Sequence, residues 1–283
     1  MAEGGVLAAQ ERSRGANQPP RSRRYGEVNW IGLWTLTKRE IMRFMKVPAQ
    51  TVLAPLVSTL LFMVVFLLAM AGSPGRTSPV AGVSYGAFLA PGLIMMGLLS
   101  NAFANSSSSL IGAKMQGNSV DFLMPPLSAA ELTVAFITGA AARGIVVGLA
   151  SAAIALPFTH VQIAHWWAVF YFGLSAAVIM AALGLLGGIW AEKFDQLAVI
   201  TNFIVTPLTF LSGTFYSISR LPGPVAAASH YNPIFLLIDG FRYGFIGHAD
   251  GSLLAGVVVL TSADFLLGLL LWRLLATGYK LRP

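Results

Sequence analysis

The sequence predicts an all-α integral membrane protein with six transmembrane helices, and three observations support this fold class. Of its 283 residues, 56% are hydrophobic and only 10% are charged, whereas soluble domains carry roughly 25% charged residues. The apolar residues gather in separate runs, long enough for helices to cross a hydrocarbon core of roughly 30 Å. The segments between these runs are too short to bury a core of their own. We therefore expect one membrane domain, residues 29–283, preceded by a tail.

The expected tail is residues 1–28. It contains Pro19, Pro20 and five arginines but no apolar run, which is typical of a disordered segment and not of a cleavable signal peptide. With this tail in the cytoplasm, 14 of the 18 Lys and Arg residues lie on the cytoplasmic side. The positive-inside rule then predicts that both termini are cytoplasmic. The same asymmetry indicates an anionic membrane surface as the partner of the basic end, rather than nucleic acid.

Residues 29–46 have the periodicity of an amphipathic helix. Apolar residues, including Trp30 and Trp34, recur at spacings of three and four, and Arg39, Arg43 and Lys46 fall on the opposite face. This pattern predicts an interfacial helix in the inner surface of the membrane. The alternative, simple charged padding before a span, would not require two tryptophans on the face away from the arginines.

Six apolar runs follow, of which the fifth is the shortest. The expected spans cover residues 52–71, 88–110, 132–158, 166–190, 197–215 and 253–275. The third and fourth spans contain small residues that permit close helix approach, among them Gly139, Ala140, Ala141, Gly184, Gly187 and Gly188.

A short helix is expected in the cytoplasmic connection between spans two and three. Asn118 or Ser119 can cap it, and Pro125 and Pro126 end it. Between these limits lie one acid, which suits the first turn of a helix, and three apolar residues, namely Asp121, Phe122, Leu123 and Met124. A solvated loop would not need these apolar side chains, so we interpret the segment as a surface for a partner.

Another short helix is expected after the fifth span, on the outer side. Asn232 is a good N-cap and Pro233 suits the first helical position. The apolar segment 234–245 would be roughly 18 Å long, which is too short to span. A re-entrant or half-buried outer helix carrying Arg242 is the expected structure. An ordinary apolar helix resting on the outer surface is the alternative.

Two charged residues, Arg143 and Asp264, lie deep inside the expected spans. A charge at such depth is costly, and both residues lie at a similar depth, so we expect a salt bridge between spans three and six. A proton relay through Asp264, a solvated Asp264 and a pairing elsewhere remain alternatives.

Polar residues also gather in the inner half of the second span. Asn101, Asn105 and Ser106 are followed by three more serines. Two interpretations stay open. The residues form hydrogen bonds between helices, or they line a translocation path.

Two longer runs carry a family resemblance. They are FLAPGLIMMGLLSNAFANSSSSLIGAKMQGNSVDFLMPPLSAAEL (88–132), and TPLTFLSGTFYSISRLP (206–222) with HYNPIFLLIDGFRYGF (230–245). The chain closely resembles the bacterial ABC-2 type permeases, the membrane subunits of ABC exporters for polysaccharides, nodulation factors and drugs. The resemblance extends from about Trp30 to the C-terminus and implies that residues 118–125 form the coupling helix, with Asp121 at its acidic position. It also implies that 29–46 is the connecting helix and 222–245 the re-entrant pair.

The resemblance further implies the partners and the location. They are a separate ABC ATPase, a second permease copy in a homodimer, membrane lipids and the bacterial inner membrane. The sequence agrees on one point, because it contains no GxxxxGK[ST] loop. ATP and Mg²⁺ would therefore be bound by the partner, and no cofactor, metal or catalytic residue is expected in this chain. The expected function is ATP-driven export of an amphiphilic, lipid-like, glycan or drug-like substrate, and an ion-coupled secondary transporter using Asp264 is the alternative.

Overall fold

The computed structural model describes most of the chain, and the regular elements of the described part are helices. The described residues are 28–71, 80, 82–118, 124–159, 163–218, 222–224, 229 and 231–280, and no strand occurs among them. Five of their helical segments are long and apolar enough to cross a membrane, namely Ala49–Ala69, Tyr85–Met115, Ala129–Thr159, Trp166–Trp190 and Leu253–Thr277. The chain is therefore an integral membrane protein, as predicted. Most of the expected tail, residues 1–27, lies outside the described part.

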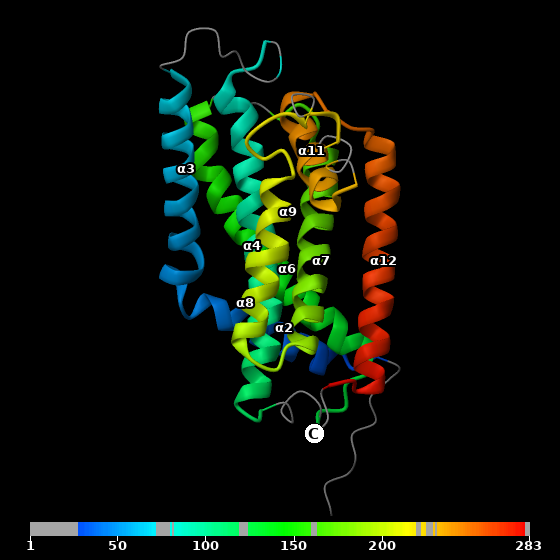
Figure 1. Ribbon diagram of the computed structural model, residues 1–283. Coiled ribbons are helices and arrows are strands. Elements are labelled where there is room, and N and C mark those ends of the chain that lie inside the picture. Colours follow the sequence, from blue (N-terminus) through cyan, green and yellow to red (C-terminus); the bar gives the residue numbers. More distant parts are fainter. Residues whose placement is uncertain are drawn as a thin grey trace, which may run out of the picture.

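The long helices run side by side, and a short helix lies at each end of the bundle (Figure 1). Helix α2 (Trp30–Met45) crosses one end, and helix α11 (Pro233–Ile246) packs into the other. Between these ends run α3 (Ala54–Ala71), α4 (Tyr85–Met115), α6 (Ala129–Thr159), α7 (Trp166–Trp190) and α12 (Leu253–Thr277). We call the two ends the α2 end and the α11 end.

The predicted fifth span contains a π-helical segment and ends early. It consists of α8 (Phe194–Ile200), a π-helical segment (Thr201–Val205) and α9 (Thr206–Phe210). Together they form a continuous apolar helix that is too short to count among the five long ones. The helix ends five residues before the predicted boundary because a tight turn follows. Gly213 adopts a φ of 75° there, and the hydroxyl of Thr214 donates to the carbonyl of Thr209 at 3.3 Å.

Helix α4 is the centre of the bundle, because small residues let α6 and α7 approach it closely. A Cβ atom at Gly144 of α6 would lie 2.8 Å from the Cβ of Ala102. On the other side, a Cβ at Gly184 of α7 would collide with the backbone carbonyl of Phe103. Most of α4 is consequently buried, whereas α3 and α12 expose most of their surface at the edges of the bundle. The small residues therefore serve helix packing, as the sequence predicted.

We predict that Gly184→Ala lowers the stability of the folded bundle. The new methyl group would meet backbone, which cannot rotate away, and overpacking of this kind typically costs about 1–3 kcal/mol. Thermal unfolding of the purified protein in detergent measures the effect. Gly268→Ala in α12 is the matched control, because a Cβ there meets nothing within 4 Å. Equal unfolding temperatures for the two variants would contradict the close α4–α7 contact.

Candidate coupling site between α2, α4 and α6

The first turn of α6 is closed by a capping box of Ser128 and Glu131. The backbone N–H of Ser128 donates to Oε2 of Glu131 at 2.6 Å, and the N–H of Glu131 donates to the Ser128 hydroxyl at 3.3 Å. These reciprocal bonds satisfy donors that the helix itself leaves free. Glu131 is buried, so its carboxylate is fixed in place.

The other oxygen of the same carboxylate fixes the start of α2. Oε1 of Glu131 accepts the backbone N–H of Asn29 at 2.5 Å. The Asn29 side chain caps α2 by accepting the N–H of Gly32 at 2.9 Å and donates from Nδ2 to the carbonyl of Pro126 at 3.2 Å. Leu127 packs directly against Gly32. One carboxylate therefore joins the loop 124–128, the start of α6 and the start of α2, and we call this group the Glu131 joint.

Helix α2 lies against α6 through a buried face that the sequence did not predict. Leu36, Thr37, Glu40 and Phe44 form this face. The side chain of Glu40 packs so closely on Gly139 of α6 that a methyl group there would collide with it. The tryptophan side chains point elsewhere.

One residue of the predicted polar face of α2 lies elsewhere. Trp30 and Trp34 are 71% and 63% exposed, so they are free to face a membrane surface, and Arg39 and Lys46 are exposed as well. Arg43 was expected on the solvent face, but it reaches into the bundle and binds α4. Arg43 lies on this side because Glu40 packs against Gly139 and the two oxygens of Asn105 accept from the Arg43 guanidinium. The amphipathic pattern of the sequence contains no information about either contact.

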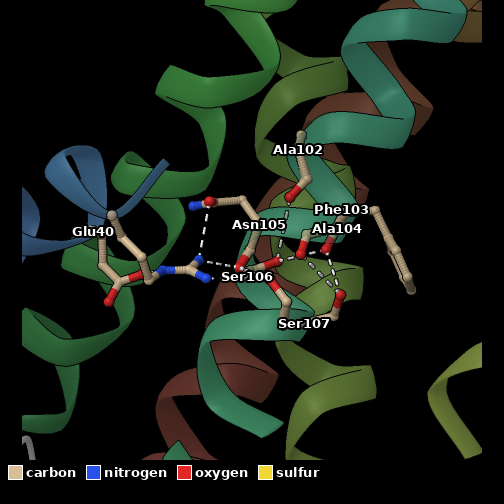
Figure 2. A network of polar contacts seen from close by, with 9 residues as sticks. Glu40, Ala102, Phe103, Ala104, Asn105, Ser106 and Ser107 are labelled. Carbon is tan, nitrogen blue, oxygen red and sulfur yellow. Dashed lines mark hydrogen bonds and ion pairs between the residues drawn. The ribbon is translucent and has the colours of Figure 1, made fainter. Parts of the chain in front are cut away.

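The guanidinium of Arg43 connects Glu40 to the polar face of α4. Its Nε lies 3.3 Å from Oε2 of Glu40, and its terminal nitrogens donate to the carbonyl and side-chain oxygen of Asn105 at 2.6 and 3.0 Å and to the Ser108 hydroxyl at 3.3 Å. Figure 2 shows Glu40 on one side of this network and Asn105 on the other. A charged guanidinium in a partly buried site is stabilised by such bonds.

The predicted salt bridge between Arg143 and Asp264 is not formed. Arg143 of α6 donates to Oδ1 of Asn101 in α4 at 3.0 Å, whereas Asp264 of α12 accepts from the Ser175 hydroxyl of α7 at 2.7 Å. Equal depth in the membrane was the basis of the prediction. Depth does not say which neighbour a side chain faces, and the two side chains face different helices.

The sequence left two interpretations open for the polar residues of α4, hydrogen bonding between helices and a translocation path, and these residues have different surroundings in the structure. Asn105 and Ser106 are buried, and the Ser106 hydroxyl donates to carbonyls of its own helix at 3.3 and 3.4 Å (Figure 2). Asn101, by contrast, lines a hollow. Ser106 is therefore accounted for by packing and hydrogen bonding, and Asn105 by its contact with Arg43. Asn101 both accepts an interhelical hydrogen bond from Arg143 and lines a hollow, so neither interpretation is excluded for it.

Two hollows flank the exposed edge of α4, and Met96 and Ser100 line both. The α3–α4 hollow measures about 390 Å³ and includes Gln50, Ser58, Thr59, Phe62 and Asn101 in its wall. The α4–α9 hollow measures about 210 Å³ and includes Ser108, Thr201, Thr206 and Thr209. Hydroxyl groups from three helices thus face the side of the bundle between α3 and α9.

The predicted coupling segment is described only at its ends. Ser119, Asp121, Phe122 and Leu123 lie outside the described residues. Asn118 is exposed, and Met124 is 79% exposed at the α2 end. Met124 is the first residue of the loop 124–128, which belongs to the Glu131 joint. Whatever contacts this segment therefore acts close to the joint.

The structure confirms the predicted helix after the fifth span. Asn232 caps α11 by accepting the N–H of Ile234 at 3.0 Å, and Pro233 is the first helical residue. Most of α11 is buried in the bundle, so it does not simply rest on the surface. Arg242 is fully buried. It donates to the carbonyl of Gly213 at 2.6 Å and stacks 3.9 Å from the centre of the Phe88 ring.

Glu40 and Glu131 are the site residues that the sequence analysis missed. A signature for Glu131 was readable, because Ser128 and Glu131 have the spacing of a capping box before an apolar run. Glu40 shares one helix face with Leu36 and Phe44, which hints at burial. No sequence pattern shows that the same carboxylate of Glu131 also binds Asn29.

Comparisons with known proteins place the chain among membrane transport subunits. The family model described as ABC-2 type transporter matches residues 32–246. The inner membrane transport permease YadH of Escherichia coli (strain K12) is 38% identical over 255 residues, which cover 89% of this chain and 98% of the relative. Nodulation protein J of Rhizobium leguminosarum bv. trifolii is 24% identical over 229 residues, which cover 79% and 83%. The family match runs from α2 to the end of α11.

We predict that Glu131→Ala destabilises the fold and frees the start of α2. The substitution removes a cap and leaves the N–H groups of Ser128 and Asn29 without their acceptor, a loss of about 2 kcal/mol. The unfolding temperature in detergent should fall, and protease should cleave near residue 29 more quickly.

Glu192→Ala is the control for this substitution. Glu192 is an exposed acid whose ion pair with Lys280 spans 3.3 Å at the same end of the bundle, and an exposed pair contributes roughly 0–1 kcal/mol. If Glu131→Ala behaves like Glu192→Ala in both measurements, the joint does not hold α2.

Proposed function

The chain belongs to the ABC-2 type transporter family, and we propose that it is the permease of an ATP-driven exporter that dimerises and moves an amphiphilic substrate outward. The family consists of membrane transport subunits, and ATP hydrolysis lies with a separate nucleotide-binding partner. The Glu131 joint is the observation that carries the proposal for this chain. Through its hydrogen bonds, a displacement of the loop 124–128 would be transmitted directly to both α2 and α6.

We place the α2 end at the cytoplasm and count the helix from Phe194 to Phe210 as a sixth crossing. The described chain enters the bundle at α2, and α12 returns to the α2 end (Figure 1). Five crossings would leave these two segments on opposite sides, which supports an even number of crossings. Most Lys and Arg residues lie in segments on the α2 side of the spans, and this excess supports the assignment of that side to the cytoplasm. The bacterial inner membrane is the proposed location, because the relative YadH is named an inner membrane permease.

A second copy of this chain is the proposed cover for the face between α3 and α9. The helices that form this face carry exposed apolar side chains, among them Val57 and Phe203, and its two hollows carry hydroxyl groups. Ser58, Thr201 and Thr209 donate to carbonyls of their own helices, but the remaining acceptor capacity of such hydroxyls is better satisfied in an enclosed polar path than in hydrocarbon. Two copies facing each other would enclose the hollows in a shared path. Lipid-like, glycan and drug-like molecules are the substrate classes that we consider for such a path.

The ion-coupled alternative depends on Asp264. One of its oxygens accepts from Ser175, and the other, Oδ1, is buried without a hydrogen-bond partner. This unsatisfied oxygen is the single observation that favours a proton site. The family assignment favours ATP as the energy source, and transport that persists without the ATPase but stops in Asp264→Asn would favour the alternative.

We predict that Asp121→Lys and Phe122→Glu each leave the permease in the membrane but weaken its complex with the ATPase. Both substitutions change the proposed contact segment, where an acid and apolar side chains suit a protein partner. Co-purification of the ATPase and its stimulated hydrolysis rate should fall by about tenfold or more, which corresponds to the loss of one interface residue of central importance.

Asp195→Lys is the matched control, because Asp195 is an exposed acid in the first turn of α8 at the same end of the bundle. It should bind and stimulate the ATPase as the unmodified chain does. If only Asp195→Lys disrupts the complex, the contact surface lies at α8 and the proposed coupling segment is wrong.

A further inference from the structure

The positive charge beside the α3–α4 hollow exceeds what the surrounding acids neutralise. Arg43 has Glu40 as its ionic partner at 3.3 Å. Arg143 lies one helical turn deeper along α4, at Asn101, and its bond to this neutral amide is 3.0 Å long. Within the described part of the chain, no carboxylate lies at ion-pair distance from Arg143. The region therefore holds two guanidinium groups and one carboxylate.

The unsatisfied polar groups in this region are hydrogen-bond donors. Nε of Arg143 and Nδ2 of Asn105 are buried without a partner. Buried donors are normally paired, so each such group calls for an explanation. An excess of donors and of positive charge is the environment that phosphate and carboxylate groups bind, because their oxygens accept several hydrogen bonds at once.

The α3–α4 hollow is polar at one end and apolar at the other, which suits an amphiphilic molecule. Gln50, Ser100 and Asn101 line its part nearer the α2 end, and Phe62 and Leu93 line its part nearer the α11 end. Asn101 lines this hollow, and Arg143 lies behind it and donates to its side-chain oxygen. Helix α3, which forms one wall, is at the edge of the bundle (Figure 1), so a lipid-like molecule can approach from the membrane.

We propose that the α3–α4 hollow binds the anionic head group of an amphiphilic substrate, with Arg143 as the residue that recognises the charge. The head group is of the phosphate or carboxylate class. The apolar chain of the substrate lies along Phe62 and Leu93. This inference rests on the proposed export function and narrows its substrate class to anionic amphiphiles.

Binding to the purified full-length chain in nanodiscs of phosphatidylcholine tests the proposal. The probe is phosphatidic acid with a fluorescent tail, and phosphatidylcholine with the same tail is the neutral comparison. The unmodified chain should bind the anionic probe at least about tenfold more tightly, as expected when one charge-assisted contact distinguishes two ligands. Equal affinity for the two lipids would overturn the proposal. Displacement of the probe by inorganic phosphate alone, at millimolar concentration, would overturn the amphiphile part.

Substitutions at Arg143 show whether the charge acts at this position. Arg143→Gln should weaken binding of phosphatidic acid about tenfold, and Arg143→Lys, which keeps the charge, should stay within about threefold. Arg273→Gln is the matched control, because Arg273 is exposed on α12 at the same end of the bundle. The same loss in Arg273→Gln as in Arg143→Gln would mean that overall charge, and not the hollow, attracts the lipid.

A cysteine reporter locates the bound probe without changing either arginine. The chain contains no cysteine, so Ser58→Cys places a single thiol in the wall of the hollow. Phosphatidic acid should protect this thiol from a maleimide reagent, and it should not protect Ser262→Cys, which is exposed on α12. Equal protection at both positions would overturn the assignment to the hollow. These measurements need no ATPase, so their failure would leave the test of ATPase coupling unaffected.

Discussion

The buried carboxylate of Glu131 is the interaction on which the α2 end of the molecule depends. It accepts backbone N–H groups from Ser128 and Asn29, and no Lys or Arg of the described chain lies at ion-pair distance from it. Three features take the place of a cation, namely the two N–H donors, the Ser128 cap and the positive end of the α6 dipole. Because one donor comes from the loop, the other from the start of α2 and the accepting carboxylate from α6, displacing any one of the three segments disturbs the other two.

The remaining contacts of α2 extend this joint into the bundle. Glu40 lies in the space that the missing side chain of Gly139 leaves on α6, and Arg43 carries the contact to Asn105 of α4. Helix α4 is in turn enclosed by α6 and α7 through small residues, so it cannot shift alone without opening close-packed contacts. A displacement of the loop 124–128 would therefore reach the two hollows beside α4 through rigid, packed elements.

The sequence was sufficient to predict most of the helices, but it did not predict which side chains of neighbouring helices contact each other. Long apolar runs predicted the five long helices, and Asn232 with Pro233 predicted the start of α11. Hydropathy could not foresee the early end of the fifth run, because hydroxyl contacts and Gly213 terminate it. It also could not pair Arg143 and Asp264 correctly, since side-chain partners depend on helix rotation. The environment of Ser106 was unpredictable for the same reason, because its burial against Gly184 depends on how two helices pack.

We infer that the loop 124–128 and α2 move as one body when the ATPase binds ATP. Spin labels at Lys38→Cys and Met124→Cys, in a chain that has no other cysteine, measure this distance directly, and labels at Lys38→Cys and Arg273→Cys measure α2 against α12. In the complex with the ATPase, the account predicts an unchanged distance between 38 and 124 with and without ATP, while the distance between 38 and 273 shifts. A changed distance between 38 and 124 with α2 fixed relative to α12 would contradict it.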